Sequence, residues 1–270
     1  MFVRSSVITL LSGAIAVGLA GCQCPFSGKG SCDNQASGSK SCSMEKSKQP
    51  MSYTVKRAKG SITIDGNWNK SAWKDVEPLE LTYYMGERPE HLPKTQAKLV
   101  YDDDAVYVIF RVEDQYIRAV AQKHQDMVCR DSCAEFFFTP GTDVAKGYYN
   151  LEMNCGGIML MYFQVVPRQP RTKLTPEDFE QIQVAHSMPT QVDPEITEPT
   201  VWTVEYRIPN TLISKYANDP VLPAPGVTWR ANFFKCGDQT SKPHWLTWSY
   251  VDRPKPDFHV PECFGTLTFE

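Results

Sequence analysis

The feature that most constrains the fold is a run of strict alternation in the middle of the chain. Along 148–155 the side chains change character at every position, and a strand places such neighbours on opposite faces. The turn sequence PGTD at 140–143 joins this run to a second strand-like run, 133–139. The stretch 126–157 is therefore predicted to form a hairpin with one apolar and one polar face. The apolar face would carry Tyr149, Leu151, Met153 and Cys155, and the polar face Tyr148, Asn150, Glu152 and Asn154.

The rest of the chain repeats this pattern of short strands. Twenty prolines and twelve tyrosines, without a long helical period, favour strands and loops. A proline-rich insertion at 164–199 is expected to border the ligand face, and it contains a short helix from Thr175 to about Ile182; a second short helix is expected at 209–217. These elements predict an all-β fold, a two-sheet antiparallel β-sandwich. The expected strands are 53–57, 61–64, 79–83, 95–101, 105–112, 133–139, 148–155, 158–166, 200–208, 228–235, 244–250 and 265–270.

The N-terminus has the features of a secretory signal. Arg4 precedes a short apolar run, 7–19, which leads into Leu-Ala-Gly-Cys at 19–22. The run is shorter than the ~20 apolar residues of a membrane-spanning helix. Leu-Ala-Gly-Cys resembles a bacterial lipobox, which implies cleavage before Cys22 and lipidation of that residue. An ordinary signal peptide that happens to precede a cysteine is the alternative.

This reading gives three segments. Residues 1–21 form the lipoprotein signal peptide, 22–50 a flexible tether rich in Ser, Gly and Lys, and 51–270 a single domain. The lipid would hold the mature protein on a membrane of the bacterial cell envelope, with the folded part in an oxidising compartment. A net charge of −3 lacks the basic excess of a nucleic-acid-binding protein, so no nucleic-acid partner is expected.

The nine cysteines fit an oxidising compartment. Cys24, Cys32 and Cys42 lie in the tether, where free thiols, local disulfides and intermolecular links all remain open. Five more lie in the domain, an odd number, so at least one is free or pairs outside the domain, and a structural disulfide is the favoured use of the others. These five are Cys129, Cys133, Cys155, Cys236 and Cys263.

Two metal sites are considered, and neither is adopted as a prediction. Zinc could be held by nitrogen and sulfur ligands, although their spacing matches no compact zinc motif; the set is Cys236, His244, His259 and Cys263. Calcium could be held by the acidic residues at 102–104 with Glu113 and Asp114, although an acidic hairpin turn is the simpler interpretation. No cofactor is expected, with structural calcium left open as an alternative.

An ordered set of motifs over 53–270 resembles the family 9 carbohydrate-binding modules. The motifs are SITIDG at 61–66 leading to Trp73, LVYD at 99–102, AVYV at 105–108, DSCAEFF at 131–137, YYNLEMN at 148–154, WTVEYRIP at 202–209 and FHVPECFG at 258–265. Two further segments, NFFKCGD at 232–238 and PHWLTW at 243–248, are similar to the branch of free-standing secreted proteins. The resemblance implies a DOMON-like sandwich, immunoglobulin-like in layout, that binds sugars or polysaccharide ends and is often associated with glycoside hydrolases.

The resemblance also assigns roles to single positions. Glu135 matches the family's sugar-binding glutamate, and Asn154 and Asn232 match asparagines of its pattern. Two tryptophans clamp the sugar in well-understood members; the first falls at or beside Cys129 here, and the second at Phe258. The family's arginine falls at Glu152, so the clamp and its specificity are altered.

Carbohydrate binding needs aromatic faces for the C–H surface of the ring and planar polar groups for its hydroxyls. The candidate binding residues are Glu135, Tyr148, Asn150, Glu152, Asn154, Arg230, Asn232, Trp245, Trp248, Phe258 and His259. At most one of Trp245 and Trp248 is expected to face ligand, because they lie three residues apart on a strand. An ordinary solvated sheet face is the alternative explanation of the polar strand face. The remaining tryptophans are expected in the core: Trp68, Trp73, Trp202 and Trp229.

We therefore expect a membrane-anchored module that binds poly- or oligosaccharide without catalysis, in carbohydrate catabolism, with glycoside hydrolases as further partners that the resemblance allows. Three alternatives stay open. A hydrolase of O-glycosyl compounds would need a carboxylate pair, for which Glu135 and Glu152 are candidates. A haem- or metal-binding DOMON-type module could use Met153, Met159 and His244. An envelope scaffold would have its ligand face filled by the proline-rich insertion.

Overall fold

The structure, a computed structural model, describes residues 48–270. The predicted signal peptide, the Cys22 that is predicted to be lipidated, and the tether cysteines lie outside the described residues. Sixteen strands are assigned: β1 (Ser52–Arg57), β2 (Leu79–Glu80), β3 (Tyr83–Tyr84), β4 (Lys94–Tyr101), β5 (Ala105–Asp114), β6 (Ile117–Ala119), β7 (Cys133–Thr139), β8 (Tyr148–Asn154), β9 (Met159–Gln164), β10 (Arg171–Lys173), β11 (Gln183–His186), β12 (Val192–Ile196), β13 (Thr200–Pro209), β14 (Thr228–Cys236), β15 (Trp245–Thr247) and β16 (Gly265–Phe269).

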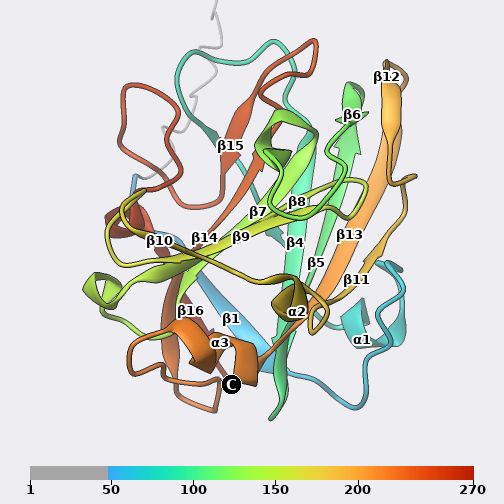
Figure 1. Cartoon of the computed structure of the whole chain (residues 1–270). Helices are drawn as coiled ribbons and strands as arrows, with labels where there is room; N and C mark the ends of the chain where they lie inside the picture. Colours follow the sequence, from blue (N-terminus) through green and yellow to red (C-terminus); the bar gives the residue numbers. More distant parts are fainter. Residues whose placement is uncertain (1–47) are drawn as a thin grey trace, which may run out of the picture. The chain divides into compact units, whose positions relative to one another are not determined.

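The strands form two layers that share one strand. The continuous order is β10-β9-β8-β7-β14-β16-β1-β4-β5-β13-β11, and β1 is the corner at which the sheet passes from one layer to the other. The first four residues of β1 pair with β16 and the last two pair with β4, in both cases parallel, whereas the other pairings are antiparallel. In Figure 1 the strands β4, β5 and β13 run nearly upright, and β8 and β9 cross them obliquely. The predicted all-β sandwich is confirmed.

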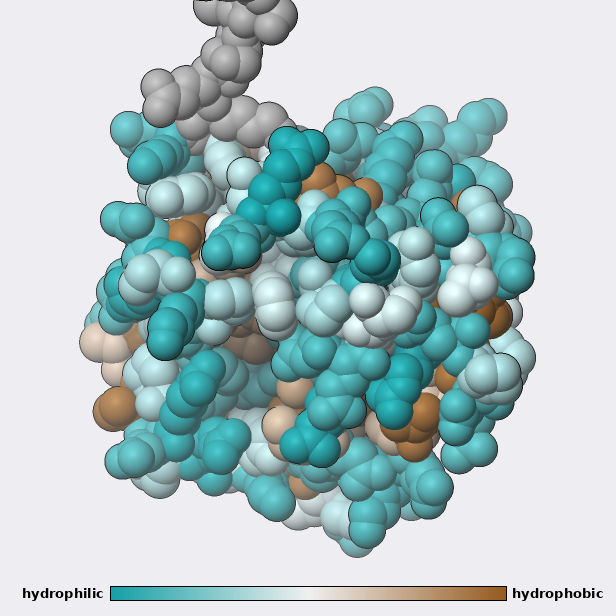
Figure 2. All heavy atoms as spheres, turned by 90° about the horizontal axis from the view of Figure 1, so that it is seen from above, coloured by the Kyte–Doolittle hydropathy of each residue, from teal (hydrophilic) through white to brown (hydrophobic). Residues whose placement is uncertain are grey.

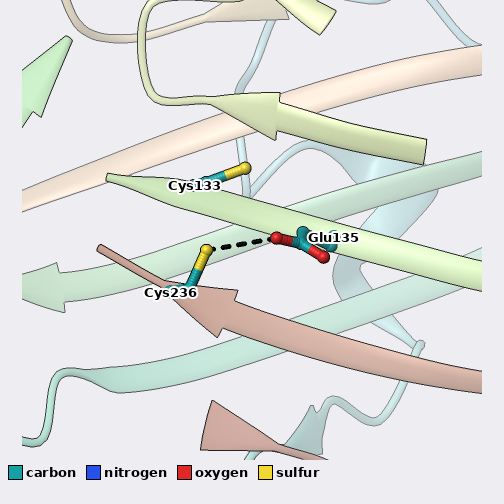
Figure 3. Close-up of side chains that lie close together, drawn as sticks. All are labelled: Cys133, Glu135 and Cys236. Atoms are coloured by element: carbon teal, nitrogen blue, oxygen red, sulfur yellow. Dashed lines mark hydrogen bonds between the residues drawn. The ribbon is translucent and has the colours of Figure 1, made fainter. Parts of the chain in front are cut away.

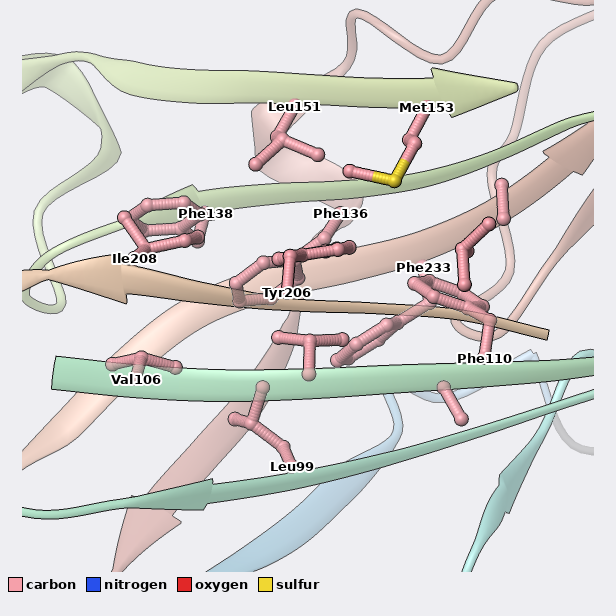
Figure 4. Close-up of a cluster of buried hydrophobic side chains, with 14 of the residues drawn as sticks. Leu99, Val106, Phe110, Phe136, Phe138, Leu151, Met153, Tyr206, Ile208 and Phe233 are labelled. Atoms are coloured by element: carbon pink, nitrogen blue, oxygen red, sulfur yellow. The ribbon is translucent and has the colours of Figure 1, made fainter. Parts of the chain in front are cut away.

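The core lies between the two layers. Alternate residues of β7 and β14 meet alternate residues of β5 and β13, and Phe136 stacks on Phe138 and Phe233 with ring centroids 4.7 and 4.8 Å apart (Figure 4). Each fully buried side chain of this size contributes roughly 1.5–3 kcal/mol relative to an exposed one. The strict alternation of β8 is thereby confirmed, since Leu151 and Met153 point into this core.

Helices are few and short. They are α1 (Ser71–Lys74), α2 (Pro176–Phe179), α3 (Asn210–Tyr216) and the 3-10 turns η1 (Val128–Arg130), η2 (Val144–Lys146) and η3 (Pro261–Cys263). The helix predicted from Thr175 to about Ile182 exists but ends earlier, at Phe179, and Thr175 and Asp178 cap it reciprocally. Among the described residues, no helix is long and apolar enough to cross a membrane.

Two expectations about the local structure need correction. The run 61–64 pairs with no strand; Ile62 and Ile64 instead pack against a small cluster around Trp73 on the outer face of the β4-β5 layer. The proline-rich insertion is more ordered than expected, because it contains β10, α2, β11 and β12. Of the tryptophans expected in the core, Trp73, Trp202 and Trp229 are fully buried, and Trp68 is half-buried beneath the Lys98 ammonium.

Candidate functional site

A cavity of about 360 Å³ lies on the face of β7, β8 and β9 that points away from the core. Its floor is made by residues that alternate with the core residues of these strands, and its walls come from loops around 127–129, 168–171, 238–245 and 256–259. The lining residues are Met127, Cys129, Glu135, Phe137, Asn150, Glu152, Leu160, Tyr162, Arg168, Arg171, Cys236, Asp238, Trp245, Pro256, Asp257, Phe258 and His259.

The polar face of β8 is enclosed rather than solvated. Asn150 is 1% exposed and Glu152 6% exposed, although an outer sheet face would normally meet water. The loops that wall the cavity cover this face. The solvated-face explanation is therefore wrong for these residues. The scaffold alternative also finds no support, because the proline-rich insertion lines the cavity with Arg168 and Arg171 and leaves it open.

A chain of hydrogen bonds fixes the polar floor. The backbone N–H of Arg168 donates to Gln164 Oε1 (2.7 Å), Gln164 Nε2 donates to Asn150 Oδ1 (2.6 Å), and Asn150 Nδ2 donates to Glu152 Oε1 (2.9 Å). Each amide in this chain has its oxygen and nitrogen assigned by its partners, so its orientation is determined. Glu152 is thus held in place from one side while its carboxyl group borders the cavity.

His259 is oriented in the same way at the other side. Its Nδ1 lies 2.8 Å from the Tyr148 hydroxyl and 3.4 Å from Gln164 Nε2. Because both neighbours can donate, Nδ1 is the acceptor and the ring proton is on Nε2. Burial, together with the nearby Arg168, lowers the pKa of His259 to about 4, which keeps the ring neutral near pH 7.

Two carboxyl groups lie side by side on the floor. Glu135 and Glu152 are register partners on antiparallel β7 and β8, so both side chains leave the same face of adjacent strands. Burial first, and the negative charge of Glu152 next, raise the pKa of Glu135 well above its usual range. Burial also raises the pKa of Glu152 to about 7, although the Asn150 hydrogen bond opposes this. The pair therefore retains protons at pH values at which exposed carboxyls are ionised.

Aromatic side chains surround these polar groups. The Trp245 indole donates through Nε1 to Asp238 Oδ1 (2.8 Å), which fixes the plane of its ring. Phe258 stacks on Phe234 with centroids 4.2 Å apart, and both Phe258 and Cys129 line the cavity. These are the two positions at which the resemblance places the clamping tryptophans. Trp245 is half-buried and is the largest aromatic ring in the cavity wall.

The structure brings part of the predicted set together. Glu135, Asn150, Glu152, Trp245, Phe258 and His259 line the cavity, and Tyr148 supports His259 from below. The other four serve the fold. Asn154 donates to Asp131, Arg230 donates to the carbonyls of Phe264 and Gly265, Asn232 holds the backbone of Ser249, and Trp248 packs against Phe233.

Several lining residues were not predicted from the sequence. Arg168 and Arg171 come from the proline-rich insertion, and Asp238 follows β14. Arg171 lies over the Tyr162 ring at 5.0 Å, and Arg168 pairs with Asp257 at 2.7 Å. The only sequence signal for the two arginines was the unusual length of the insertion, which indicates a functional segment without indicating which residues face inward.

The metal and haem ligand sets do not converge. His244 is bonded at both ring nitrogens, to Lys235 Nζ (2.7 Å) and to the Lys242 carbonyl (2.9 Å), so it is not available to zinc or haem. Met153 and Met159 are register partners buried in the core. The acidic residues considered for calcium stand at opposite ends of the ten-residue β5, about 30 Å apart, so they cannot share one ion. The favoured disulfide is not formed among the five described cysteines, which are free thiols.

Comparisons with known proteins identify similar chains. The profile of carbohydrate-binding family 9 matches residues 67–269. Among solved structures, a protein from Bacteroides uniformis ATCC 8492, to which carbohydrate binding has been ascribed, is similar with a TM-score of 0.74 and 27% sequence identity, covering 82% of this chain and 100% of that chain. Among curated proteins, none matches.

Two further structures share the fold at lower identity. A family 9 carbohydrate-binding module from Caldicellulosiruptor kristjanssonii in complex with cellotriose has a TM-score of 0.54 at 16% identity, covering 82% of this chain and 94% of that chain. A family 9 module from the same organism in complex with glucose has a TM-score of 0.53 at 16% identity, covering 81% and 96%.

Proposed function

Because the chain belongs to carbohydrate-binding family 9, we propose that the cavity over β7, β8 and β9 binds sugar units of an oligo- or polysaccharide without changing them chemically. One observation carries this proposal. Planar polar groups held in fixed orientation, Glu152 and His259 among them, share one cavity with the Trp245 and Phe258 rings. This is the combination that hydroxyl groups and the C–H face of a pyranose require.

The size of the cavity fits a small ligand or the end of a longer one. Its volume of about 360 Å³ lies at the lower end of the range of small-molecule sites, roughly 300–1,000 Å³. The molecular face shown in Figure 2 is dominated by hydrophilic residues, with hydrophobic residues in small separate patches. A broad apolar contact with a protein is therefore not the interaction that this face favours.

The direct test is binding of the folded chain to a panel of plant, algal and bacterial glycans and their oligosaccharides, by affinity electrophoresis and calorimetry. For a glycan that binds, Trp245→Ala is expected to weaken the affinity about 10- to 30-fold, because it removes the largest aromatic wall. Tyr84→Ala, on the strand that pairs with β15 and outside the cavity, is the matched control and should bind normally. A folded chain that binds nothing in the panel, or a Trp245→Ala chain that binds as tightly as wild type, contradicts the proposal.

Binding should strengthen as the pH rises from about 6 to 8. The Glu152 carboxyl, whose pKa is raised to about 7, is mostly neutral below this range and mostly ionised above it. An ionised carboxylate forms hydrogen bonds about twice as strong with hydroxyl donors as a neutral acceptor does. Glu152→Gln keeps the acceptor for Asn150 but does not titrate, so its affinity should vary less with pH than that of wild type. Equal pH dependence in both chains would contradict the role given to Glu152.

Hydrolysis of O-glycosyl bonds is the second candidate. It is favoured by the register pairing of Glu135 with Glu152, because retaining glycosidases use two carboxyls about 5–5.5 Å apart. Both carboxyls, however, leave the same sheet face instead of facing each other across a ligand. Chromatography of the oligosaccharides recovered from the binding experiments separates the two functions, since release of shorter sugars that Glu135→Gln abolishes would establish an enzyme.

The N-terminus suggests where this binding takes place. We infer from Leu-Ala-Gly-Cys at 19–22 that Cys22 is lipidated and holds the domain on the cell envelope, where glycoside hydrolases that act on the same glycan would be natural partners in catabolism. Mass spectrometry of the mature N-terminus tests the anchor. An unmodified Cys22 in protein isolated from bacterial membranes would contradict it.

A further inference from the structure

Two thiols and a carboxyl group meet at the floor of the cavity. The ligand atoms of Cys133, Glu135 and Cys236 all lie within 4.8 Å of one another, and the Cys236 thiol donates to Glu135 Oε1 at 3.1 Å (Figure 3). All three side chains are buried, with at most 1% exposed. Among the described residues, these three side chains are the potential metal ligands whose atoms lie close enough together to hold one ion.

The strand register creates this group. Cys133 on β7 and Cys236 on β14 are direct partners across an antiparallel pair, and Glu135 lies two residues further along β7. Residues two apart on a strand share a face, so the two β7 side chains stand side by side with Cys236 opposite. The three ligands therefore come from the middle of one sheet, where neighbouring strands on both sides hold the backbone.

The local electrostatics call for a cation. Besides the two thiols, the groups that act most strongly on Glu135 are Glu152 and Asp238, both acidic. Burial keeps the thiols of Cys133 and Cys236 neutral by raising each pKa, so the two thiols carry no charge as they stand. A bound cation would stabilise the deprotonated form of the group, because buried charges in proteins are ordinarily paired or coordinate metals.

We propose that Cys133, Glu135 and Cys236 bind one Zn²⁺ ion, with a fourth coordination position open to the cavity. Two sulfur ligands and one carboxylate oxygen suit zinc and exclude calcium, which prefers oxygen ligands only. In a tetrahedral zinc site the two sulfurs would lie about 3.8 Å apart at bond lengths of about 2.3 Å. The observed ligand atoms, which all lie within 4.8 Å of one another, are close to this spacing.

The open position follows from the placement of the ligands. Glu135 and Cys236 line the cavity, so an ion between them would face it. Three protein ligands with a free fourth position characterise zinc sites that bind water or a substrate group. The two thiol protons and the Glu135 carboxyl proton would leave to solvent as zinc binds, and the fourth ligand would be a water molecule or a hydroxyl group of a bound molecule. Zinc binding does not depend on the proposed carbohydrate function.

The test uses the full chain with Cys22→Ser, Cys24→Ser, Cys32→Ser and Cys42→Ser, so that only domain thiols remain to bind metal. The reduced, metal-free protein is titrated with Co²⁺ and then with Zn²⁺, without sugar. We expect one equivalent of Co²⁺, thiolate-to-cobalt charge-transfer absorption with intense tetrahedral d–d bands, and complete displacement by Zn²⁺. Cys133→Ser and Cys236→Ser should each weaken the affinity at least about 100-fold, the upper end of the cost of losing an outer-shell partner.

The controls separate this site from general thiol binding and from misfolding. Cys155→Ser replaces a buried core thiol directly after β8 and should leave the titration unchanged. Glu135→Gln keeps both thiols and the shape of the site, and should retain charge-transfer absorption at reduced affinity. Circular dichroism checks the fold of each variant.

Three results would overturn the proposal. The first is no metal bound by folded, reduced protein at equimolar concentration. The second is an unchanged metal affinity in all three folded variants, Glu135→Gln, Cys133→Ser and Cys236→Ser. The third is a Cys133–Cys236 disulfide in protein isolated from an oxidising compartment, detected by peptide mass spectrometry after alkylation of free thiols.

Discussion

A Lys235→Met chain is expected to lose about 3–5 kcal/mol of unfolding free energy, because it leaves a buried carboxylate without its cation. The Lys235 side chain is 0% exposed, and its Nζ lies 3.4 Å from Asp114 Oδ2 and 2.7 Å from His244 Nε2. Burial alone would raise the pKa of Asp114, but the charge of Lys235 and the hydrogen bond from His91 hold it well below its usual range. The carboxylate is therefore ionised in the core and depends on Lys235.

His244 completes this cluster as a neutral ring. Burial lowers the pKa of His244 to about 3, so Nε2 accepts from Lys235 while Nδ1–H donates to the Lys242 carbonyl. Because this pKa is depressed below the unfolded value, the stability that His244 contributes is present above about pH 6.5 and is lost as the pH falls toward 3. Acid should unfold the wild-type chain over this window.

Urea unfolding at pH 7 measures the effect of Lys235→Met. Lys59→Met, which removes an exposed partner of Asp75, is the matched control and should change little. The double change Lys235→Met/Asp114→Asn should be more stable than Lys235→Met alone, since it removes the orphaned charge. A single variant as stable as wild type, with an unchanged urea dependence, would show that Asp114 does not need Lys235.

Glu205→Ala should cost a similar amount, about 3–5 kcal/mol, because one buried carboxylate satisfies four donors from the segment 65–73, which lies more than 130 residues away in sequence. Its oxygens accept from Trp73 Nε1 (2.8 Å), from the backbone N–H groups of Asp65 (3.0 Å) and Gly66 (2.7 Å), and from Lys70 Nζ (2.5 Å). Glu205 is 0% exposed, so its removal leaves the buried Trp73 indole N–H and the backbone N–H groups of Asp65 and Gly66 without this acceptor, whereas Lys70 keeps Asp65 and the Thr63 carbonyl as partners.

Calorimetry and urea unfolding measure this loss, with Glu113→Ala as the control. Glu113 pairs with Arg111 at the surface, so its removal should have little effect. The loop that Glu205 holds lies on the β4-β5-β13 layer, whereas the cavity lies on the outer face of β7-β8-β9. Folded Glu205→Ala protein should therefore bind ligand as wild type does. A loss of binding without a loss of stability would contradict this separation.

The contact between two sequence motifs shows what can and cannot be predicted from the sequence alone. The segments SITIDG at 61–66 and WTVEYRIP at 202–209 were each recognisable, and alternation placed Glu205 on the face opposite Trp202 and Val204. Nothing in either segment indicated that the Glu205 carboxylate accepts hydrogen bonds from the backbone N–H groups of Asp65 and Gly66. Such a contact depends on how β13 and the loop before α1 meet in space, across more than 130 residues of chain.

The strands and their faces follow from the sequence by itself, because period-two alternation is a local property of an extended backbone. The sequence was sufficient to predict the hairpin at 126–157, the burial of Leu151 and Met153, and the family. The enclosure of the polar face was decided by the tertiary structure. Loops from four separate parts of the chain close over Asn150 and Glu152, and this burial raises the pKa of Glu152.

The same holds for the thiols. The sequence shows an odd number of domain cysteines without pairing them, because proximity across strands depends on sheet order. The order β8-β7-β14 brings together side chains about a hundred residues apart in sequence, and it does so beside Glu135. Local sequence patterning determined which residues lie on the cavity side of their strands. Strand order and loop packing decided which of these side chains meet, how far they are shielded from water, and what they can bind.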